Sequence, residues 1–307
     1  MYLYQLKNKN ELNEIKEKPF KLEKELQEVC EKNIELFFGL KFIRSEFSIG
    51  NYRIDTLAFN IQSNSFVIIE FKKDRNYSVI DQGYAYLALM LNNKADFILE
   101  YNENCNKNLK RDDIDWSQSK VIFVSTFFTS YQRDSINFKD LPIELWEVKR
   151  YENEIIYFNQ IKSSNTSETI KTISKNNNNI ETVNKEIKVY SESDHTNDRP
   201  EEIIELYERF KNAVLNINDN ISINPTKVYI GFIYNKKNIV DICILKKAIK
   251  MWLNVKSGEL NDPKNISRDV SAIGHWGNGD YEIKISDDEN FEYIVSLIKD
   301  VYNKIVK

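Results

Sequence analysis

Apolar residues in the first half of the chain recur at two spacings, and each spacing predicts one kind of element. A period of about 3.6 residues over 21–38, and again over 79–92, predicts two amphipathic helices. Runs rich in β-branched and aromatic residues predict strands at 42–49, 52–60, 65–72, 121–126 and 143–148, with a turn at Gly50 and Asn51. The order helix, three-strand meander, helix, strand, strand predicts an α/β sandwich with a mixed sheet.

The second half shows a different pattern after a long polar stretch. Residues 161–199 are rich in Ser, Asn, Thr, Lys and Glu and contain Tyr190 as their only aromatic residue, a composition that favours a polar flexible linker. Beyond it, the pattern predicts helices at 200–215 and 290–306 and strands at 227–234, 239–245 and 281–285. We therefore expect a first domain at 1–160, a linker at 161–199 and a small α+β domain at 200–307.

Composition narrows the function classes. The chain has 307 residues, 41% hydrophobic and 29% charged, with a net charge of −4, so a nucleic-acid partner would need a local basic surface. Its three cysteines argue against a disulfide framework and fit a reducing cytoplasm. No apolar run approaches the roughly 20 residues that span a bilayer, so we expect a cytoplasmic protein without a membrane partner.

Three charged residues of the first domain indicate a metal site. Asp55 interrupts an otherwise apolar strand, and Glu70 and Lys72 lie two apart on VIIEFK, so both project from one face. If the two strands pair as a hairpin, Asp55 approaches Glu70, and two close carboxylates repel unless a cation lies between them. Mg²⁺ or Mn²⁺ suits such oxygens, and the carbonyl of Phe71 would supply a further ligand. Lys72 would activate water or stabilise charge on a phosphate.

The alternative to a metal site is that these residues are ordinary surface charges. An isolated Asp with an ExK triplet is common in a Lys-rich chain and is usually solvated. The setting favours a site, since the triplet ends a strand too apolar to be exposed on both faces. Two further pairs lie on the predicted helices: Glu23 with Glu25 beside the apolar face of the first, and Gln82 with Tyr86 one turn apart on the second. Their alternatives are a solvated helix edge for the acids and a core position for the tyrosine.

Taken in order, the acidic helix, the RID strand, the EFK strand and the QxxxY helix resemble the PD-(D/E)XK nucleases, especially RecB-type nucleases and NucS-like endonucleases. The segment EKELQEVCEKNIEL resembles the first helix of NucS-like proteins, and the resemblance covers residues 22–91. It implies a restriction-endonuclease-like fold. The resemblance assigns the helical acid to Glu23, with Glu25 in reserve, and the metal-binding pair to Asp55 and Glu70. It assigns the catalytic lysine to Lys72 and the QxxxY motif to Gln82 and Tyr86. One departure is Ile54, where the family name has proline.

The second domain resembles the C-terminal module of bacterial proteins labelled as predicted transport proteins, on the segments ICILKKAIKMWL and SRDVSAIGHWGNGDYEIKI. Its glycine-containing loop allows two interpretations. One is a demanding turn in which Gly274, Gly277 and Gly279 supply positive φ and Trp276 packs on the core. The other is a loop that binds a ligand or partner, and its residues of functional type are Arg268, Asp269, His275, Trp276, Asn278 and Asp280.

The leading hypothesis is a Mg²⁺- or Mn²⁺-dependent DNA endonuclease, with repair and anti-phage defence as the processes it would suit and a homodimer left open. The runner-up is a catalytically inactive protein that keeps the nuclease fold to bind nucleic acid or protein, and a transport component is a third hypothesis. Phosphate contacts would come from local basic groups. These groups are Lys72, Lys73 and Arg75; Lys107, Lys110 and Arg111; and Lys246, Lys247 and Lys250.

Overall fold

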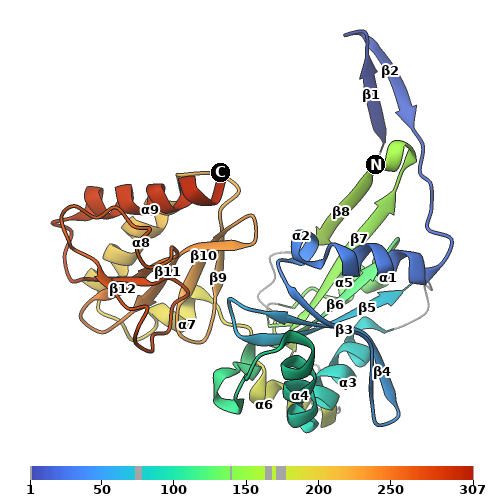
Figure 1. The fold of residues 1–307 in the computed structure, drawn as a ribbon, viewed down its shortest axis with the longest axis horizontal. Helices are drawn as coiled ribbons and strands as arrows, with labels where there is room; N and C mark the ends of the chain where they lie inside the picture. Colours follow the sequence, from blue (N-terminus) through green and yellow to red (C-terminus); the bar gives the residue numbers. More distant parts are fainter. Residues whose placement is uncertain (1, 73–77, 139, 163–167, 171–177, 307) are drawn as a thin grey trace. The chain divides into compact units, whose positions relative to one another are not determined.

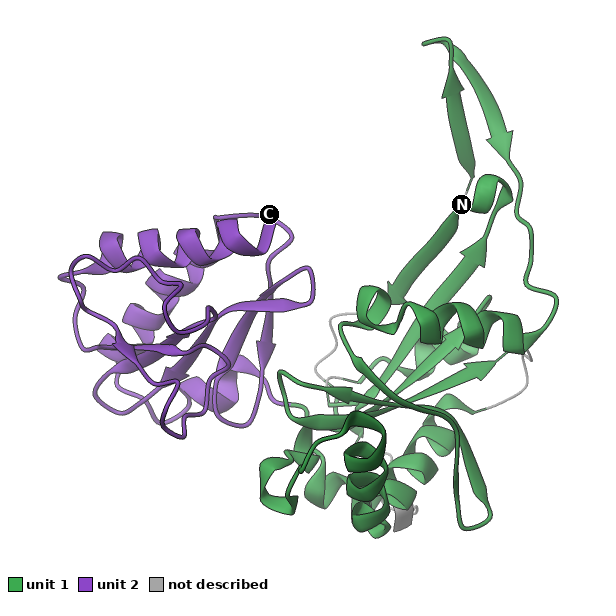
Figure 2. Cartoon of the chain, in the orientation of Figure 1, with its two compact units in different colours: residues 1–189 green, residues 190–307 purple. Residues whose placement is uncertain are grey.

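The computed structural model describes residues 2–72, 78–138, 140–162, 168–170 and 178–306. The chain divides into two compact units, Met1–Val189 and Tyr190–Lys307, shown in green and purple in Figure 2. Each unit has its own sheet and its own apolar core.

A six-stranded mixed sheet forms the centre of the first unit (Figure 1). Its strands lie in sequence order: β3 (Lys41–Ile49), β4 (Tyr52–Asn60), β5 (Ser65–Lys72), β6 (Lys120–Ser125), β7 (Ile143–Arg150) and β8 (Ile156–Ile161). β5, β6 and β7 are parallel, and the other neighbours are antiparallel. The expected mixed sheet is confirmed, and the three-strand meander is β3–β4–β5. Seven consecutive residues of β5 are buried, which explains its unbroken apolar run.

Helices cover both faces of this sheet, so the unit is the expected α/β sandwich (Figure 1). α1 (Glu23–Lys32) and α2 (Ile34–Phe38) pack on one face. α3 (Val79–Asn92), α4 (Lys94–Cys105) and the later α6 (Asn178–Glu186) lie on the other. The single helix predicted at 21–38 is two helices, because Asn33 leaves helical geometry with φ −121°. α3 has the predicted bounds, and its Gly83 sits against the side chain of Ile143, where a Cβ would lie 2.5 Å from a side-chain carbon.

Several short elements carry too weak a pattern to be predicted. β1 (Leu3–Lys7) and β2 (Glu11–Ile15) form an antiparallel hairpin in which charged and apolar residues mix along both strands. The others are α5 (Ser130–Ser135) and the 3₁₀ turns η1 (Arg111–Asp113), η2 (Trp116–Gln118) and η3 (Glu152–Glu154).

The described part of 161–199 differs from the expected flexible linker. Ile170, Ile180, Val183 and Ile187 are buried in the core beside α3, and Tyr84 donates a hydrogen bond to Asn184 Oδ1 at 3.2 Å. The reason is spacing: 180, 183 and 187 form one helical stripe within a polar composition. Residues from Tyr190 onward belong to the second unit, which includes α7 (Glu192–Thr196) with His195 buried.

The second unit is a six-stranded antiparallel sheet with helices, which confirms the expected second α+β module. Its strands are β9 (Ser222–Pro225), β10 (Ile230–Tyr234), β11 (Lys237–Ile244), β12 (Ile249–Leu253), β13 (Arg268–Asp269) and β14 (Tyr281–Ile285). The strand order across the sheet is β13-β14-β12-β11-β10-β9. α8 (Glu201–Leu215) and α9 (Phe291–Val306) pack on β11 and β12. In the ranges that the structure describes, no helix is both long and apolar enough to cross a membrane.

Candidate functional site

The site begins where β4 and β5 stop pairing. The last pair of their register before this point is Thr56 with Ile69, so Asp55 and Glu70 come next on the two strands. Here the carboxylate Oδ2 of Asp55 accepts a hydrogen bond from the backbone N–H of Phe71 at 2.9 Å. A side-chain carboxylate thus takes over from the backbone ladder at this end of the sheet. The hairpin arrangement expected for Asp55 and Glu70 is present.

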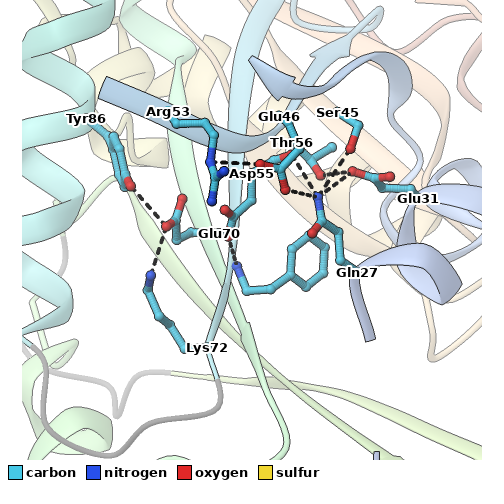
Figure 3. A network of polar contacts seen from close by, with 11 residues as sticks. Gln27, Glu31, Ser45, Glu46, Arg53, Asp55, Thr56, Glu70, Lys72 and Tyr86 are labelled. Carbon is cyan, nitrogen blue, oxygen red and sulfur yellow. Dashed lines mark hydrogen bonds and ion pairs between the residues drawn. The ribbon is translucent and has the colours of Figure 1, made fainter. Parts of the chain in front are cut away.

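Glu70 lies at the centre of the site and is 3% exposed. Its Oε1 accepts hydrogen bonds from Lys72 Nζ at 2.8 Å and from the Tyr86 hydroxyl at 2.9 Å (Figure 3). Gln82 Nε2 reaches the same hydroxyl at 3.4 Å. The structure therefore brings Glu70, Lys72, Gln82 and Tyr86 together.

The second carboxylate oxygen of Glu70 is the unexplained atom of the site. Oε2 is buried, and no group in the described ranges forms a hydrogen bond with it. A buried charged oxygen without a partner is costly. A cation placed between this atom and the second carboxylate would offset that cost.

The electrostatics of Asp55 point the same way. Burial, and after it the neighbouring Glu70 carboxylate, raises the pKa of Asp55 to about 7. The N–H of Phe71 and the ammonium of Lys72 lower this pKa, and Glu23 raises it. Near neutral pH, a positive charge beside Asp55 would therefore favour its ionised form.

The donor set fits a hard divalent cation. It consists of the carboxylates of Asp55 and Glu70 and the backbone carbonyl of Phe71, whose own N–H lies against Asp55. Over the residues that the structure describes, no group of three or more His, Cys, Asp or Glu side chains is placed to hold a metal. Mg²⁺, which is commonly bound by one or two carboxylates plus water, is a good match.

The structure distinguishes the two acids at the start of α1. Glu23 is exposed in the first helical turn, and its charge acts on Asp55. Glu25 accepts a hydrogen bond from the backbone N–H of Lys21 at 3.0 Å and pairs with Arg150 at 3.5 Å. Glu25 is therefore engaged elsewhere, and Glu23 is the acid that influences the site.

Sequence reasoning missed a polar network on the α1 side of Asp55 (Figure 3). Gln27 is buried, and its Nε2 donates to the backbone carbonyl of Asp55 at 3.0 Å and to Glu31 Oε1 at 3.0 Å. The same nitrogen lies 3.3 Å from Ser45 Oγ and 3.4 Å from Glu46 Oε1. The available signal was a glutamine on the buried stripe of α1, between Leu26 and Cys30. This amide ties helix α1 to both strands of the hairpin.

The other basic groups named from the sequence are placed unevenly. Lys73 and Arg75 lie outside the described residues. Lys107, Lys110 and Arg111 are exposed in the segment after α4. In the second unit, Lys246 and Lys247 are exposed between β11 and β12, while Lys250 pairs with Glu282 at 3.2 Å.

The glycine loop of the second unit corrects both parts of the turn interpretation. Gly274, Gly277 and Gly279 are not among the positive-φ glycines, which in the described residues are Gly39, Gly50 and Gly258. Space is what two of them provide: a Cβ would lie 2.4 Å from the Trp252 ring at Gly277 and 1.8 Å from the Leu253 carbonyl oxygen at Gly279. Trp276 is 71% exposed and does not pack on the core.

Of the remaining loop residues, Asn278 holds the loop down. It donates from its backbone N–H and its side chain to the buried carboxylate of Asp241 at 2.7 and 2.9 Å. The other members bond locally: Arg268 with Glu282, Asp269 with Ser271, His275 with the Ile273 carbonyl, and Asp280 with the Ser257 N–H.

Comparison with protein families and curated sequences gives two matches. Residues 192–304 match the model of a domain of unknown function, DUF5655, which coincides with the second unit. The whole chain is 54% identical over 291 residues to a Haemophilus influenzae protein described as "Uncharacterized protein". The match covers 95% of this chain and 96% of that one.

Three solved structures also match part of the chain. A repair endonuclease from Pyrococcus abyssi shares 17% identity over 39% of this chain and 44% of its own, with a TM-score of 0.22. The EndoMS–dsDNA2 complex shares 18% identity over 42% of this chain and 57% of its own, with a TM-score of 0.25. Pyrococcus furiosus SfsA in complex with Ca²⁺ shares 11% identity over 46% of this chain and 65% of its own, with a TM-score of 0.24. The chain thus spans between about two fifths and two thirds of these solved chains. At such scores the likeness carries no weight for function, which has to rest on the site itself.

Proposed function

We propose that this chain, which belongs to the same family as the Haemophilus influenzae protein, is a Mg²⁺- or Mn²⁺-dependent nuclease that hydrolyses phosphodiester bonds in DNA. One observation carries the proposal. Glu70 has a buried oxygen without a partner in the described ranges, next to Asp55, whose pKa burial and Glu70 raise to about 7. Both features are costly in the bare protein, and a divalent cation would relieve both.

Each residue of the site has a role in this proposal. Asp55, Glu70 and the Phe71 carbonyl would hold the cation, which when bound supplies Lewis-acid stabilisation of a phosphoryl oxygen. Lys72 is tied to Glu70 Oε1, so its ammonium is positioned to orient a water molecule and to stabilise charge on the phosphate. Tyr86 fixes the same carboxylate oxygen from α3, and Gln82 orients the Tyr86 hydroxyl. Glu23 would add negative charge at the metal side of the site.

The decisive experiment incubates the full chain with plasmid, single-stranded and branched DNA in Mg²⁺, Mn²⁺ or EDTA. We expect cleavage with either metal, none in EDTA, and a loss of at least about 100-fold in Asp55→Asn and Lys72→Ala. Glu103→Gln and Lys299→Ala are matched controls, because Glu103 is exposed on α4 and Lys299 is exposed on α9. They should cleave like the unmodified chain.

Two outcomes would contradict the proposal. Equal cleavage by Asp55→Asn, Lys72→Ala and the unmodified chain would show that another site or a contaminant is responsible. DNA binding without cleavage on every substrate and with both metals would instead favour a binding module built on the same fold. The processes that such a nuclease would suit are DNA repair and defence against phage.

A further inference from the structure

Arg53 is a charged residue of β4 that lies next to the candidate site. The roles proposed above do not include it. It stands two positions before Asp55 on the same strand, so the two side chains project from the same face, about 7 Å apart at Cα. Its side chain is 67% exposed, whereas Asp55 is partly buried. Arg53 therefore lies on the solvent side of the carboxylate pair.

The guanidinium is held by one edge only. Arg53 Nε lies 2.7 Å from Glu46 Oε2, and no other carboxylate of the described residues pairs with it. An arginine has five N–H donors in a rigid fork, so the N–H groups of both terminal nitrogens remain for another acceptor. Figure 3 shows this fork above the carboxylates of Asp55 and Glu70.

The support behind Arg53 leads to Asp55. Glu46 Oε1 accepts a hydrogen bond from Gln27 Nε2 at 3.4 Å, and the same nitrogen donates to the Asp55 carbonyl at 3.0 Å. One buried amide thus binds the backbone of the proposed metal-binding acid and lies beside the arginine's partner (Figure 3).

The backbone of Glu46 is also unusual. It lies between Ser45 and Phe47, which pair with Thr56 and Ile54, so it faces Asp55 across the hairpin. Its φ is +52°, a left-handed conformation that is uncommon for a residue other than glycine. Such conformations tend to occur where a site needs a side chain in a particular place. The carboxylate of this residue is the one that pairs with Arg53.

The exposed ion pair of Arg53 with Glu46 contributes little to stability. We propose that Arg53 binds a backbone phosphate of the DNA strand, next to the phosphate that reacts at Asp55 and Glu70. The free face of its guanidinium would grip two phosphate oxygens, and Glu46 and Gln27 would keep the fork aimed. This inference rests on the proposed nuclease function, since that function supplies the substrate.

The test measures DNA binding apart from cleavage. Fluorescence anisotropy of labelled double- and single-stranded oligonucleotides in EDTA, at several salt concentrations, is compared for the unmodified chain, Arg53→Gln, Arg53→Lys and Arg44→Gln. Arg44 is the matched control, because it lies on the neighbouring strand β3, its side chain is 55% exposed, and it also pairs with a glutamate, Glu100 at 3.5 Å.

We expect Arg53→Gln to weaken binding about tenfold, as loss of a charge-assisted contact does, and to reduce the slope of log affinity against log salt by about 0.9. Arg53→Lys should keep the slope and recover part of the affinity, because the charge remains and the fork is lost. Arg44→Gln should change neither. Equal losses in Arg53→Gln and Arg44→Gln, no loss in Arg53→Gln, or no DNA binding by the unmodified chain would each overturn the phosphate contact.

The outcomes also separate this inference from the nuclease proposal. Binding that depends on Arg53 without any metal-dependent cleavage would retain the phosphate contact and contradict the nuclease. Metal-dependent cleavage with binding that ignores Arg53 would do the reverse.

Discussion

Glu70 and Asp55 carry two close carboxylates, and the ammonium of Lys72 is the cation that pairs with one oxygen of Glu70 in the described residues. Lys72 and Tyr86 both bind one oxygen of Glu70, and the Phe71 N–H binds one oxygen of Asp55. The protein therefore keeps two carboxylates close together at a cost in stability, which is common where a site is prepared for a ligand. Variants of Asp55 and Tyr86 measure this electrostatic cost.

The first concerns the pH dependence of stability without metal. The folded-state pKa of Asp55, about 7, lies above its ordinary value of 3.8, so the folded chain retains a proton that the unfolded chain has released. The contribution of this protonation to the free energy of unfolding is fully present below about pH 4 and is lost as the pH rises through about 7. We expect the melting temperature in EDTA to fall between pH 5 and pH 8, and to fall less in Asp55→Asn. Mn²⁺ should restore it at pH 8 in the unmodified chain only. An identical fall in Asp55→Asn would contradict this origin.

The second concerns Tyr86. Tyr86→Phe removes the hydroxyl that donates to Glu70 Oε1 and leaves the ring packed in the core. Loss of a hydrogen bond that orients a metal ligand typically weakens metal binding by 10-fold or more, so we expect about tenfold weaker Mn²⁺ binding by calorimetry. Tyr131→Phe is the control, because Tyr131 is 74% exposed on α5. Unchanged Mn²⁺ affinity in Tyr86→Phe would show that this bond does not orient a metal ligand.

At the scale of elements, the site depends on which helices hold the sheet from each side. α1 reaches the site through Gln27, and α3 reaches it through Tyr86. α3 is in turn packed by α6, from the polar stretch 161–199. A helix that composition alone would assign to a linker therefore supports the helix that carries Gln82 and Tyr86.

A charge placed in this contact tests the role of α6. Val183 is fully buried, while the neighbouring Thr182 is exposed. We expect Val183→Asp to lower the free energy of unfolding of the first unit by at least about 3 kcal/mol, because the new charge is buried without a partner. Thr182→Asp should change it by less than about 0.5 kcal/mol. Urea denaturation of both variants measures the difference, and equal stability would return α6 to the status of a linker.

At the scale of the whole molecule, the chain contains two separate cores. The first unit has an apolar cluster on each face of its mixed sheet, and the second has a large cluster between its sheet and helices α8 and α9. The domain model at 192–304 coincides with the second unit and leaves the first outside it.

Complete cores predict independent folding. A fragment of residues 190–307 should unfold cooperatively by itself, because its core includes residues from β10, β11, β12, β14, α8 and α9 and none from the first unit. In the full chain, Val183→Asp should lower the temperature at which the first unit unfolds. The transition of the second unit should stay at the temperature measured for the fragment. Calorimetry of the full chain and the fragment measures both, and a fragment without a cooperative transition would contradict independence.

The sequence by itself determined the strongly patterned elements and the central acids. The bounds of β4, β5 and α3 were predictable because apolar periodicity is set by local spacing, and Asp55, Glu70 and Lys72 stood out as charges in apolar strands. Strand register then made their meeting predictable, since side chains alternate between faces. The metal, the catalytic roles and DNA as substrate remain proposals.

Only the tertiary structure decided the rest, because it depends on contacts between residues far apart in the chain. Gln27 binds a backbone carbonyl 28 positions further along the chain. Glu46 has a positive φ that no local sequence pattern predicts. The glycines of the second unit were needed for space against Trp252 and Leu253, which a sequence cannot show. α6 forms because its apolar residues are buried against α3. The free energy gained from this burial stabilises a helix whose composition is otherwise polar.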